Sequence, residues 1–178
     1  YDQGNLTKAI KLYEKAIELD PDYAKAYYNL GVAYYDQGNL TKAIQSYEKA
    51  IELDPDYANA YYNLGIAYDD QGNTTKAIES YKKAIELDPD DADAYNSMGY
   101  AYELQGNYTK AIQSYKKAIK LDPDDADAYI ILGLAYADQG NPTKAIQSFE
   151  KAIEIKPDYA KAYDGMGNAY ELQGNYTK

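Results

Sequence analysis

The sequence predicts an all-α fold, a solenoid of antiparallel helix hairpins, from two periodic features and one amphipathic pattern. Glycine recurs every 34 residues, at Gly4, Gly38, Gly72, Gly106, Gly140 and Gly174. Proline recurs at the same interval, at Pro21, Pro55, Pro89, Pro123 and Pro157. Between these residues, apolar side chains are spaced three and four positions apart, which is typical of helices with one buried face. A constant period of this length indicates a repeat protein.

Residues 24–57 show the two helices of one repeat. The apolar positions of the first helix are Ala26, Tyr27, Leu30, Ala33 and Tyr34, and those of the second are Ala43, Ile44, Tyr47, Ala50 and Ile51. Between the two stretches, Gly38 suits a helix C-cap and Asn39 the N-cap of the next helix. Pro55 ends the second helix, because proline cannot continue it and pushes the preceding residue out of the α region. Each repeat is therefore predicted to be a helix–turn–helix.

The repeat boundaries predict a single array over residues 1–178. Residues 1–23 form a half repeat with a second helix, about Leu6 to Leu19, and residues 160–178 form one with a first helix, about Ala160 to Leu172. The four complete repeats between them are residues 24–57, 58–91, 92–125 and 126–159. The chain begins at Tyr1 rather than at Met, as a fragment of a longer protein would.

The repeat resembles the tetratricopeptide repeat (TPR), whose motif is W-x2-L-G-x2-Y, then A-x3-F, then P. Residues 24–57 match it as Tyr27-x2-Leu30-Gly31-x2-Tyr34, Ala43-x3-Tyr47 and Pro55. The other repeats depart from the motif in the same way, with Tyr for Trp throughout and Met98 and Met166 for Leu, and both changes keep apolar volume. The resemblance covers the whole chain. It implies a right-handed superhelical array that acts as a non-catalytic protein–protein interaction scaffold.

The composition argues against several other classes of function. Cys, His, Trp and Arg are absent, so a disulfide framework, a Cys or His metal site and a catalytic triad are not expected, and neither is an enzyme or a cofactor. The 18 lysines face 29 acidic residues, a net charge of −11, which argues against nucleic acid and anionic membranes as partners. No apolar run approaches the roughly 18 residues of a membrane span. The composition is compatible with a cytoplasmic or a secreted location.

The resemblance also implies that the first helices line a concave groove that binds a peptide. Helical spacing i, i+3, i+7, i+10 selects the outward stripe of each first helix. The candidate groove residues are Lys25, Tyr28, Val32, Tyr35, Asn59, Tyr62, Ile66, Asp69, Asp93, Asn96, Tyr100, Glu103, Asp127, Ile130, Leu134, Lys161, Asp164 and Asn168. Their apolar members favour binding over an unconstrained solvent face, which is the alternative interpretation of the same variable positions. Because acidic residues outnumber lysines along the stripe, a neutral or basic peptide with apolar anchors is the expected ligand.

One family activity can be tested against the sequence. TPR arrays that hold the acidic C-terminal tails of heat-shock chaperones use a carboxylate clamp of Lys, Asn, Asn, Lys and Arg. The clamp arginine has no counterpart here, because the chain contains no Arg. The second clamp lysine is replaced by Tyr28, Tyr62, Asn96, Ile130 or Asp164. The chain is therefore not expected to be a carboxylate-clamp protein.

A structural module that binds itself is the alternative function. The half repeats leave apolar faces at both ends of the chain, and these two faces are complementary because every complete repeat packs the same pair of helices. The residues of these faces are Ala9, Leu12, Tyr13 and Ala16 at one end, and Tyr163, Met166, Gly167 and Tyr170 at the other. Such a head-to-tail contact is heterologous, so repeated addition of copies would give a filament.

The turns between the two helices of a repeat carry N-x-[ST] glycosylation acceptors. The candidate asparagines are Asn5, Asn39, Asn73, Asn107 and Asn175, whereas Pro142 spoils the pattern after Asn141. The alternative interpretation is that each asparagine caps the helix that follows it. The sequence leaves both interpretations open.

Overall fold

The computed structural model describes residues 3–176, and the side chains of residues 4–174. Within this range the chain forms ten α-helices and no strand, which confirms the all-α prediction. The helices are α1 (Gln3–Leu19), α2 (Ala24–Asp36), α3 (Leu40–Leu53), α4 (Ala58–Asp70), α5 (Thr74–Leu87), α6 (Ala92–Leu104), α7 (Tyr108–Leu121), α8 (Ala126–Asp138), α9 (Pro142–Ile155) and α10 (Ala160–Tyr176). The even-numbered helices are the first helices of the repeats, and the odd-numbered ones are the second helices.

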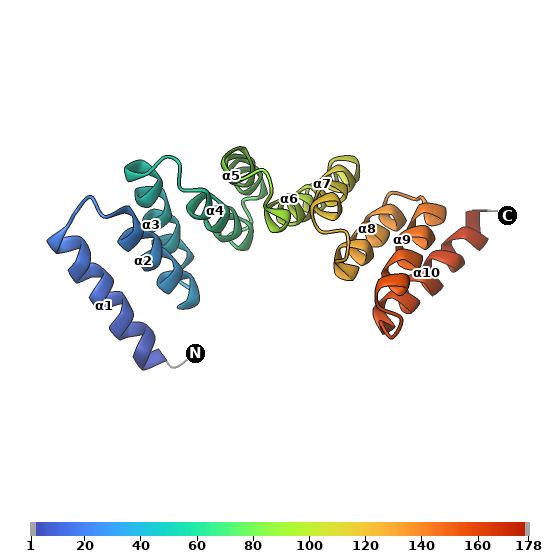
Figure 1. Cartoon of the computed structure of the whole chain (residues 1–178), viewed down its shortest axis with the longest axis horizontal. Helices are drawn as coiled ribbons and strands as arrows, with labels where there is room; N and C mark the ends of the chain where they lie inside the picture. Colours follow the sequence, from blue (N-terminus) through green and yellow to red (C-terminus); the bar gives the residue numbers. More distant parts are fainter. Residues whose placement is uncertain (1–2, 177–178) are drawn as a thin grey trace. The chain divides into compact units, whose positions relative to one another are not determined.

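The helices form two compact units, residues 1–89 with α1–α5 and residues 90–178 with α6–α10. Inside each unit, each helix packs against the next one in the chain (Figure 1). First helices of successive repeats also contact each other, α2 with α4 in unit 1 and α8 with α10 in unit 2. The first helices α2, α4 and α8 thus each lie against both their own second helix and a neighbouring repeat.

Glycine makes the turn inside each repeat. Gly38 has a φ of +79°, a backbone region that side chains with a Cβ rarely adopt. The turn is closed by the N–H of Asn39, which donates to the Tyr34 carbonyl at 2.8 Å. The Asn39 side chain then accepts from the N–H of Lys42, so it is the N-cap of α3. The same backbone hydrogen bond and the same cap recur after α4, α6 and α8.

The core of each repeat is a large ring against a glycine. Tyr47, Tyr81, Tyr115 and Phe149 are the largest fully buried side chains of the described residues. The ring of Tyr47 lies on Gly31 of the preceding helix, so close that a Cβ on Gly31 would come within 2.6 Å of the ring. Alanines 43 and 50 are completely buried on the same helix as Tyr47. Small residues at fixed positions therefore allow the two helices of a repeat to approach closely.

The two terminal helices are longer than the repeat pattern predicts. Helix α1 begins at Gln3 instead of about Leu6, and α10 continues to Tyr176 instead of ending near Leu172. Gly4 and Gly174 are therefore helical, although they occupy the same repeat position as Gly38.

Candidate peptide-binding surfaces

In unit 1 the predicted stripe lies along α2 and α4, and its tyrosines are packed instead of free. The ring centroid of Tyr28 is 4.9 Å from that of Tyr57 and 6.0 Å from that of Tyr47. The amide nitrogen Nδ2 of Asn63 on α4 donates to the Tyr28 hydroxyl at 2.9 Å. Tyr28 therefore joins two consecutive repeats, which its position on a single helix did not reveal.

Tyr62 occupies the same place one repeat later. Its ring centroid lies 6.0 Å from that of the buried Tyr81, and its side chain is half-buried. In unit 1 the tyrosines of the predicted outward stripe are therefore half-buried and not exposed. The other apolar stripe residues of this unit, Val32, Tyr35 and Ile66, are half-buried as well.

The acidic residues of unit 1 are tied to tyrosines. The Tyr35 hydroxyl donates to Oδ2 of Asp70, and this hydrogen bond, ahead of burial, raises the pKa of Tyr35 to about 12. The Tyr81 hydroxyl donates to Oδ2 of Asp69 at 3.0 Å, whereas Oδ1 of Asp69 is buried without a hydrogen-bond partner. Burial raises the pKa of Asp69, and the nearby charge of Asp70 adds to the rise, whereas the Tyr81 hydrogen bond opposes it.

Unit 2 does expose apolar anchors. Tyr100 on α6 is 55 % exposed and Leu134 on α8 is 48 % exposed, and they stand at equivalent positions of two successive first helices. Glu103 lies one turn after Tyr100, and Asp138 is close enough to raise the pKa of the Glu103 carboxyl. Burial is the larger cause of that rise, and the hydrogen bond from the Tyr115 hydroxyl opposes it. Unit 2 therefore combines two exposed apolar side chains with two neighbouring carboxylates.

Ile130 is a correction to the predicted stripe. It is only 7 % exposed, so it belongs to the core and not to a surface. The reason is its repeat position, which is that of Tyr28 and faces the junction with the next first helix; for Ile130 that helix is α10, which contacts α8. Asn96 at the same position of α6 is half-buried, and its Oδ1 is buried without a hydrogen-bond partner.

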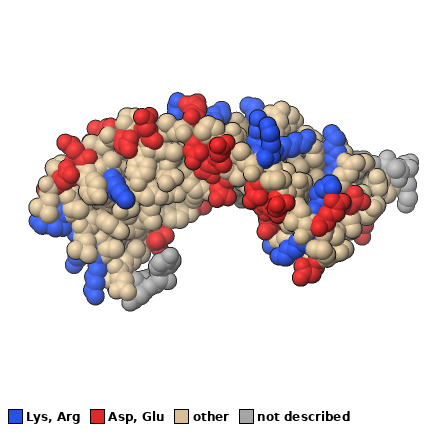
Figure 2. Space-filling model, in the orientation of Figure 1, with Lys and Arg blue, Asp and Glu red and all other residues tan. Residues whose placement is uncertain are grey.

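The remaining predicted groove residues are polar and lie at the surface. They are Lys25, Asn59, Asp93, Asp127, Lys161, Asp164 and Asn168. Asp127 is engaged, because it accepts a hydrogen bond from the Tyr159 hydroxyl. Figure 2 shows that lysines (blue) and acidic residues (red) both lie on the displayed face of each unit.

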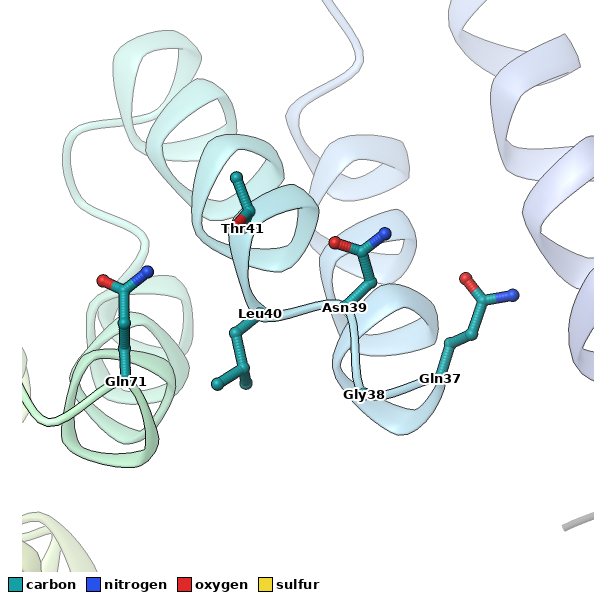
Figure 3. A pocket seen from close by; sticks show the side chains of 6 residues that line it. All are labelled: Gln37, Gly38, Asn39, Leu40, Thr41 and Gln71. Atoms are coloured by element: carbon teal, nitrogen blue, oxygen red, sulfur yellow. The ribbon is translucent and has the colours of Figure 1, made fainter.

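Two hollows lie away from the stripe. One lies at the turn after α2, lined by Gln37–Thr41 together with Gln71 of the next repeat (Figure 3). The other lies between α4 and α5 and is lined by Tyr61, Leu64 and charged side chains of α5. Neither brings together a nucleophile and a base, and the described residues contain no group of three Asp or Glu side chains placed to hold a metal ion. In the same range, no helix is long and apolar enough to cross a membrane.

A third hollow of about 300 Å³ lies between α1 and α2. Asn5, Leu6, Ala9 and Tyr13 of α1 line one side, and Asn29, Val32, Ala33 and Asp36 of α2 the other. It joins residues of the predicted self-assembly face to Val32 of the predicted groove. At the other end of the chain, Tyr163, Gly167 and Tyr170 of α10 are exposed and Met166 is half-buried.

The comparisons with known proteins agree with this architecture. Family models described as TPR repeat match residues 1–38 and 33–72, and models described as tetratricopeptide repeat match residues 62–126, 98–160 and 132–178. The chain therefore belongs to the tetratricopeptide-repeat family. No curated protein sequence matches the chain.

Several solved structures are similar over most of the chain. The crystal structure of MamA is 36 % identical, with a TM-score of 0.84, over 89 % of this chain and 93 % of that one. YrrB, described as a TPR protein with an unusual peptide-binding site, is 30 % identical, with a TM-score of 0.79, over 90 % of this chain and 83 % of that one. MamA from Desulfovibrio magneticus RS-1 is 22 % identical, with a TM-score of 0.82 and 89 % of each chain covered, and shows the fold alone.

Proposed function

We propose that this protein–protein interaction scaffold binds a neutral or basic peptide segment with apolar anchors, without catalysing a reaction. The observation that carries the proposal is the surface of unit 2, where the exposed Tyr100 and Leu134 each precede a carboxylate by about one helical turn, Glu103 on α6 and Asp138 on α8, and the two carboxylates are close enough to interact. An apolar side chain of the ligand would cover Tyr100 and Leu134, and a cationic side chain next to it would reach the two carboxylates. The peptide-binding site of the similar YrrB supports the same use of this fold.

The charge of the surface argues against the opposite ligand class, an acidic peptide. Asp138 already disfavours the ionised form of Glu103, so a peptide carboxylate brought to this place would add a third negative charge. A lysine or arginine side chain would instead relieve the repulsion between the two carboxylates. The surface therefore selects for a positive charge next to the apolar anchor.

The test uses three synthetic peptides with the same leucine and tyrosine positions, whose remaining residues are lysine, serine or glutamate. We expect affinity to fall from the lysine to the serine to the glutamate peptide, as measured by calorimetry at low and high salt. Tyr100→Ala should weaken the lysine peptide by about 2 kcal/mol, the cost of losing an aromatic hot spot. The matched control is Tyr23→Ala, which also removes an exposed tyrosine but lies in unit 1, outside the stripe. Equal binding of the glutamate peptide, or equal losses in the two variants, would contradict the proposal.

A second candidate function is head-to-tail assembly of copies of this chain. The observation that favours it is the pair of open apolar faces on α1 and α10, of which the first borders the hollow between α1 and α2. Light scattering over a range of concentrations separates the two functions. A monomer that binds peptide supports the scaffold alone, whereas continued growth of the particle with concentration supports assembly.

A further inference from the structure

Helix α7 differs in charge from the other second helices. It carries four lysines and no carboxylate, although the whole chain has a net charge of −11. The helices α1, α3, α5 and α9 each carry two glutamates beside their lysines. On the displayed face of unit 2, lysines gather over α7 (Figure 2). An acidic molecule thus has one strongly basic helix, which the peptide-binding surface proposed above does not use.

Three positions of the second helix account for most of this difference. In α7 they are Lys116, Lys117 and Lys120, and all three side chains are exposed. Residues three and four apart lie on one side of a helix, so Lys120 is a neighbour of both other lysines. At the same positions the other second helices have Glu14, Lys15 and Glu18; Glu48, Lys49 and Glu52; Lys82, Lys83 and Glu86; and Glu150, Lys151 and Glu154.

In the other second helices an ion pair joins the second and third of these positions. Its length is 2.5 to 2.8 Å in each of the four helices. In α7 a lysine replaces the glutamate, and within residues 4–174 neither Lys117 nor Lys120 has an ion pair. Like charges at this spacing slightly destabilise a helix. The helix dipole favours Lys120 in the last turn, yet four second helices have glutamate there, so the fold does not require a lysine.

Lys116 replaces a residue that joins successive repeats. In two repeats a glutamate at this position accepts from the tyrosine hydroxyl of the next first helix, as Glu48 does from Tyr68 at 2.7 Å. Lys116 instead lies over the ring of Tyr136 on α8, with its ammonium 5.4 Å from the ring centroid. The contact to the next repeat is therefore kept, while the charge of the position changes from negative to positive.

Apolar side chains border these lysines. The hollow between α4 and α5 described above has Tyr61 and Leu64 on one side and the corresponding three side chains of α5 on the other. The equivalent residues of α6, which packs against α7, are Tyr95 and Met98, and both are half-buried. A methionine side chain adapts its shape to different apolar groups. A ligand that reaches the lysines of α7 can therefore cover apolar surface as well.

We propose that Lys116, Lys117 and Lys120, together with Tyr95 and Met98, form a second binding surface, the lysine surface, for an acidic peptide segment of a partner protein. Carboxylates of the segment accept charge-assisted hydrogen bonds from the three ammonium groups. An apolar side chain next to these carboxylates covers Tyr95 and Met98. Charge complementarity assigns the occupant, because the partner supplies the carboxylates that the other second helices supply themselves.

The lysine surface does not rest on the peptide-binding surface proposed above. The carboxylates of that surface, Glu103 and Asp138, lie on the first helices α6 and α8, and they favour a basic ligand. The lysine surface lies on the second helix α7 and favours an acidic one. Unit 2 can therefore hold two partner segments of opposite charge.

The size and the surroundings of the lysine surface favour a short peptide over nucleic acid or a membrane. Lys116 and Lys120 are four residues apart, about 6 Å along the helix axis. Just after α7 the chain continues with the exposed Asp122 and Asp124. Their carboxylates would repel a polyanion that extends past the lysines. A segment with two or three carboxylates is short enough to avoid this repulsion.

The probe is a fluorescent peptide of about nine residues with a central leucine, three glutamates and otherwise glycine and serine. We expect the 178-residue chain to bind it, as measured by fluorescence anisotropy, and the affinity to fall as salt is added, because salt screens exposed charges. The same peptide with glutamine in place of glutamate should bind about tenfold more weakly or less. Equal affinity of the two peptides would overturn the proposal.

Lys116→Glu with Lys120→Glu removes the lysine surface and keeps the fold, because the two changes give α7 the charge pattern of α3 and α9. We expect this variant to bind the acidic peptide about tenfold more weakly or less, with an unchanged circular dichroism spectrum. The matched control is Lys8→Glu with Lys11→Glu, which changes the net charge equally at two exposed lysines of α1. It should bind the peptide as the wild type does, and equal losses in the two variants would overturn the proposal.

Phosphate ligands are tested with the same two variants. A single strand of about ten nucleotides and phosphatidylserine vesicles should both bind more weakly than the acidic peptide. Tighter binding of either, lost in Lys116→Glu with Lys120→Glu, would overturn the assignment to a peptide.

Tyr100→Ala keeps this test separate from that of the proposed function. It should leave the acidic peptide unaffected, and a loss would place that peptide on the surface of Tyr100 and overturn the proposal. The glutamate peptide of the earlier test would also bind the lysine surface, so that test is made in the Lys116→Glu, Lys120→Glu chain, where only the surface of Tyr100 remains. Either of the two surfaces can then fail while the other one stands.

Discussion

Gly31 and Tyr47 are in contact across the two helices of their repeat, and a Cβ on residue 31 would lie 2.6 Å from both Cδ1 and Cε1 of the ring. The same contact joins Gly65 to Tyr81, Gly99 to Tyr115 and Gly133 to Phe149. Real Cβ atoms do not come this close, so a side chain at residue 31 would push the helices apart. The glycine that recurs within the first helix, such as Gly31, is therefore required for packing and does not break the helix.

Gly31→Ala tests this contact. Alanine has the higher helix propensity by about 1 kcal/mol, which favours the variant if packing is ignored. Overpacking of a filled core costs about 1–3 kcal/mol, so we expect Gly31→Ala to be less stable than Gly167→Ala by about that amount. Urea unfolding at a concentration where the chain is monomeric measures both. Equal stability of the two variants would show that the Tyr47 ring moves aside freely.

The framework of this fold was predictable because it repeats. Gly31, Tyr34, Ala43 and Tyr47 have equivalents at the same spacing in every complete repeat, with Phe149 in place of Tyr in the last one, so periodicity alone identified these core positions. The structure buries these positions. Family models across the chain and similar solved structures confirm the TPR architecture.

The candidate site was less predictable, because it depends on contacts between repeats. Spacing on one helix placed Tyr28 and Ile130 on the outward stripe, yet both lie at the junction with the following first helix. Asn63, which donates to Tyr28, was absent from the predicted groove. One signal was available in the sequence. One repeat after Tyr115 and Glu103, Phe149 replaces the tyrosine and Ala137 replaces the glutamate, and this joint change indicates that the two positions are in contact.

Tyr28 and Tyr100 should respond differently to truncation, although the sequence placed both in one row of anchors. Tyr28 packs on Tyr57 and Tyr47 and accepts from Asn63, so Tyr28→Ala should lower the free energy of unfolding by about 2–4 kcal/mol, towards the cost of a core aromatic. Tyr100 is largely exposed, so Tyr100→Ala should change stability by no more than about 0.5 kcal/mol. Thermal unfolding of both variants measures the difference. Equal losses of stability would contradict the distinction between a packed Tyr28 and an exposed Tyr100.

The stability of unit 2 should depend on the protonation of Glu103. Its pKa is raised in the folded state, chiefly by burial, so the folded state holds this proton at pH values where the unfolded state has lost it. The resulting stabilisation is complete below the unfolded-state pKa and is lost as the pH rises through the raised folded-state pKa. Glu103→Gln keeps an oxygen acceptor for the Tyr115 hydroxyl and removes the titration.

We therefore expect the unfolding free energy of the wild type to fall, relative to that of Glu103→Gln, as the pH rises from about 4 to 7. Asp138 lies nearby and contributes to the shift, so Asp138→Asn should reduce the difference. Urea unfolding at a series of pH values measures it. Parallel curves for the wild type and Glu103→Gln would mean that Glu103 titrates as a solvent-exposed carboxyl does.

The asparagines of the turns give a prediction that separates capping from glycosylation. Asn39, Asn73 and Asn107 lie in N-x-[ST] patterns and Asn141 does not, yet all four accept from the N–H three residues later. Asn39→Ala and Asn141→Ala should therefore each destabilise the chain by about 1 kcal/mol, the usual value of an N-cap. The matched variants Asn39→Asp and Asn141→Asp keep the acceptor and should be close to the wild type.

Asn5 lies inside the first helical turn of α1, so it is not in a turn between two helices as Asn39 is. The side chain of Asn175 lies outside the described residues. Glycosylation attaches to the amide nitrogen of asparagine, whereas capping uses its oxygen, so the cap leaves the modification chemically open. Intact-mass spectrometry of chain produced in a glycosylating host measures it directly. We expect the mass of the bare chain, because capping already accounts for asparagine at the non-acceptor Asn141. Added sugar mass, reduced by the glycan of one site in Thr41→Ala, which keeps the Asn39 cap, would overturn that expectation and assign the turns a second use.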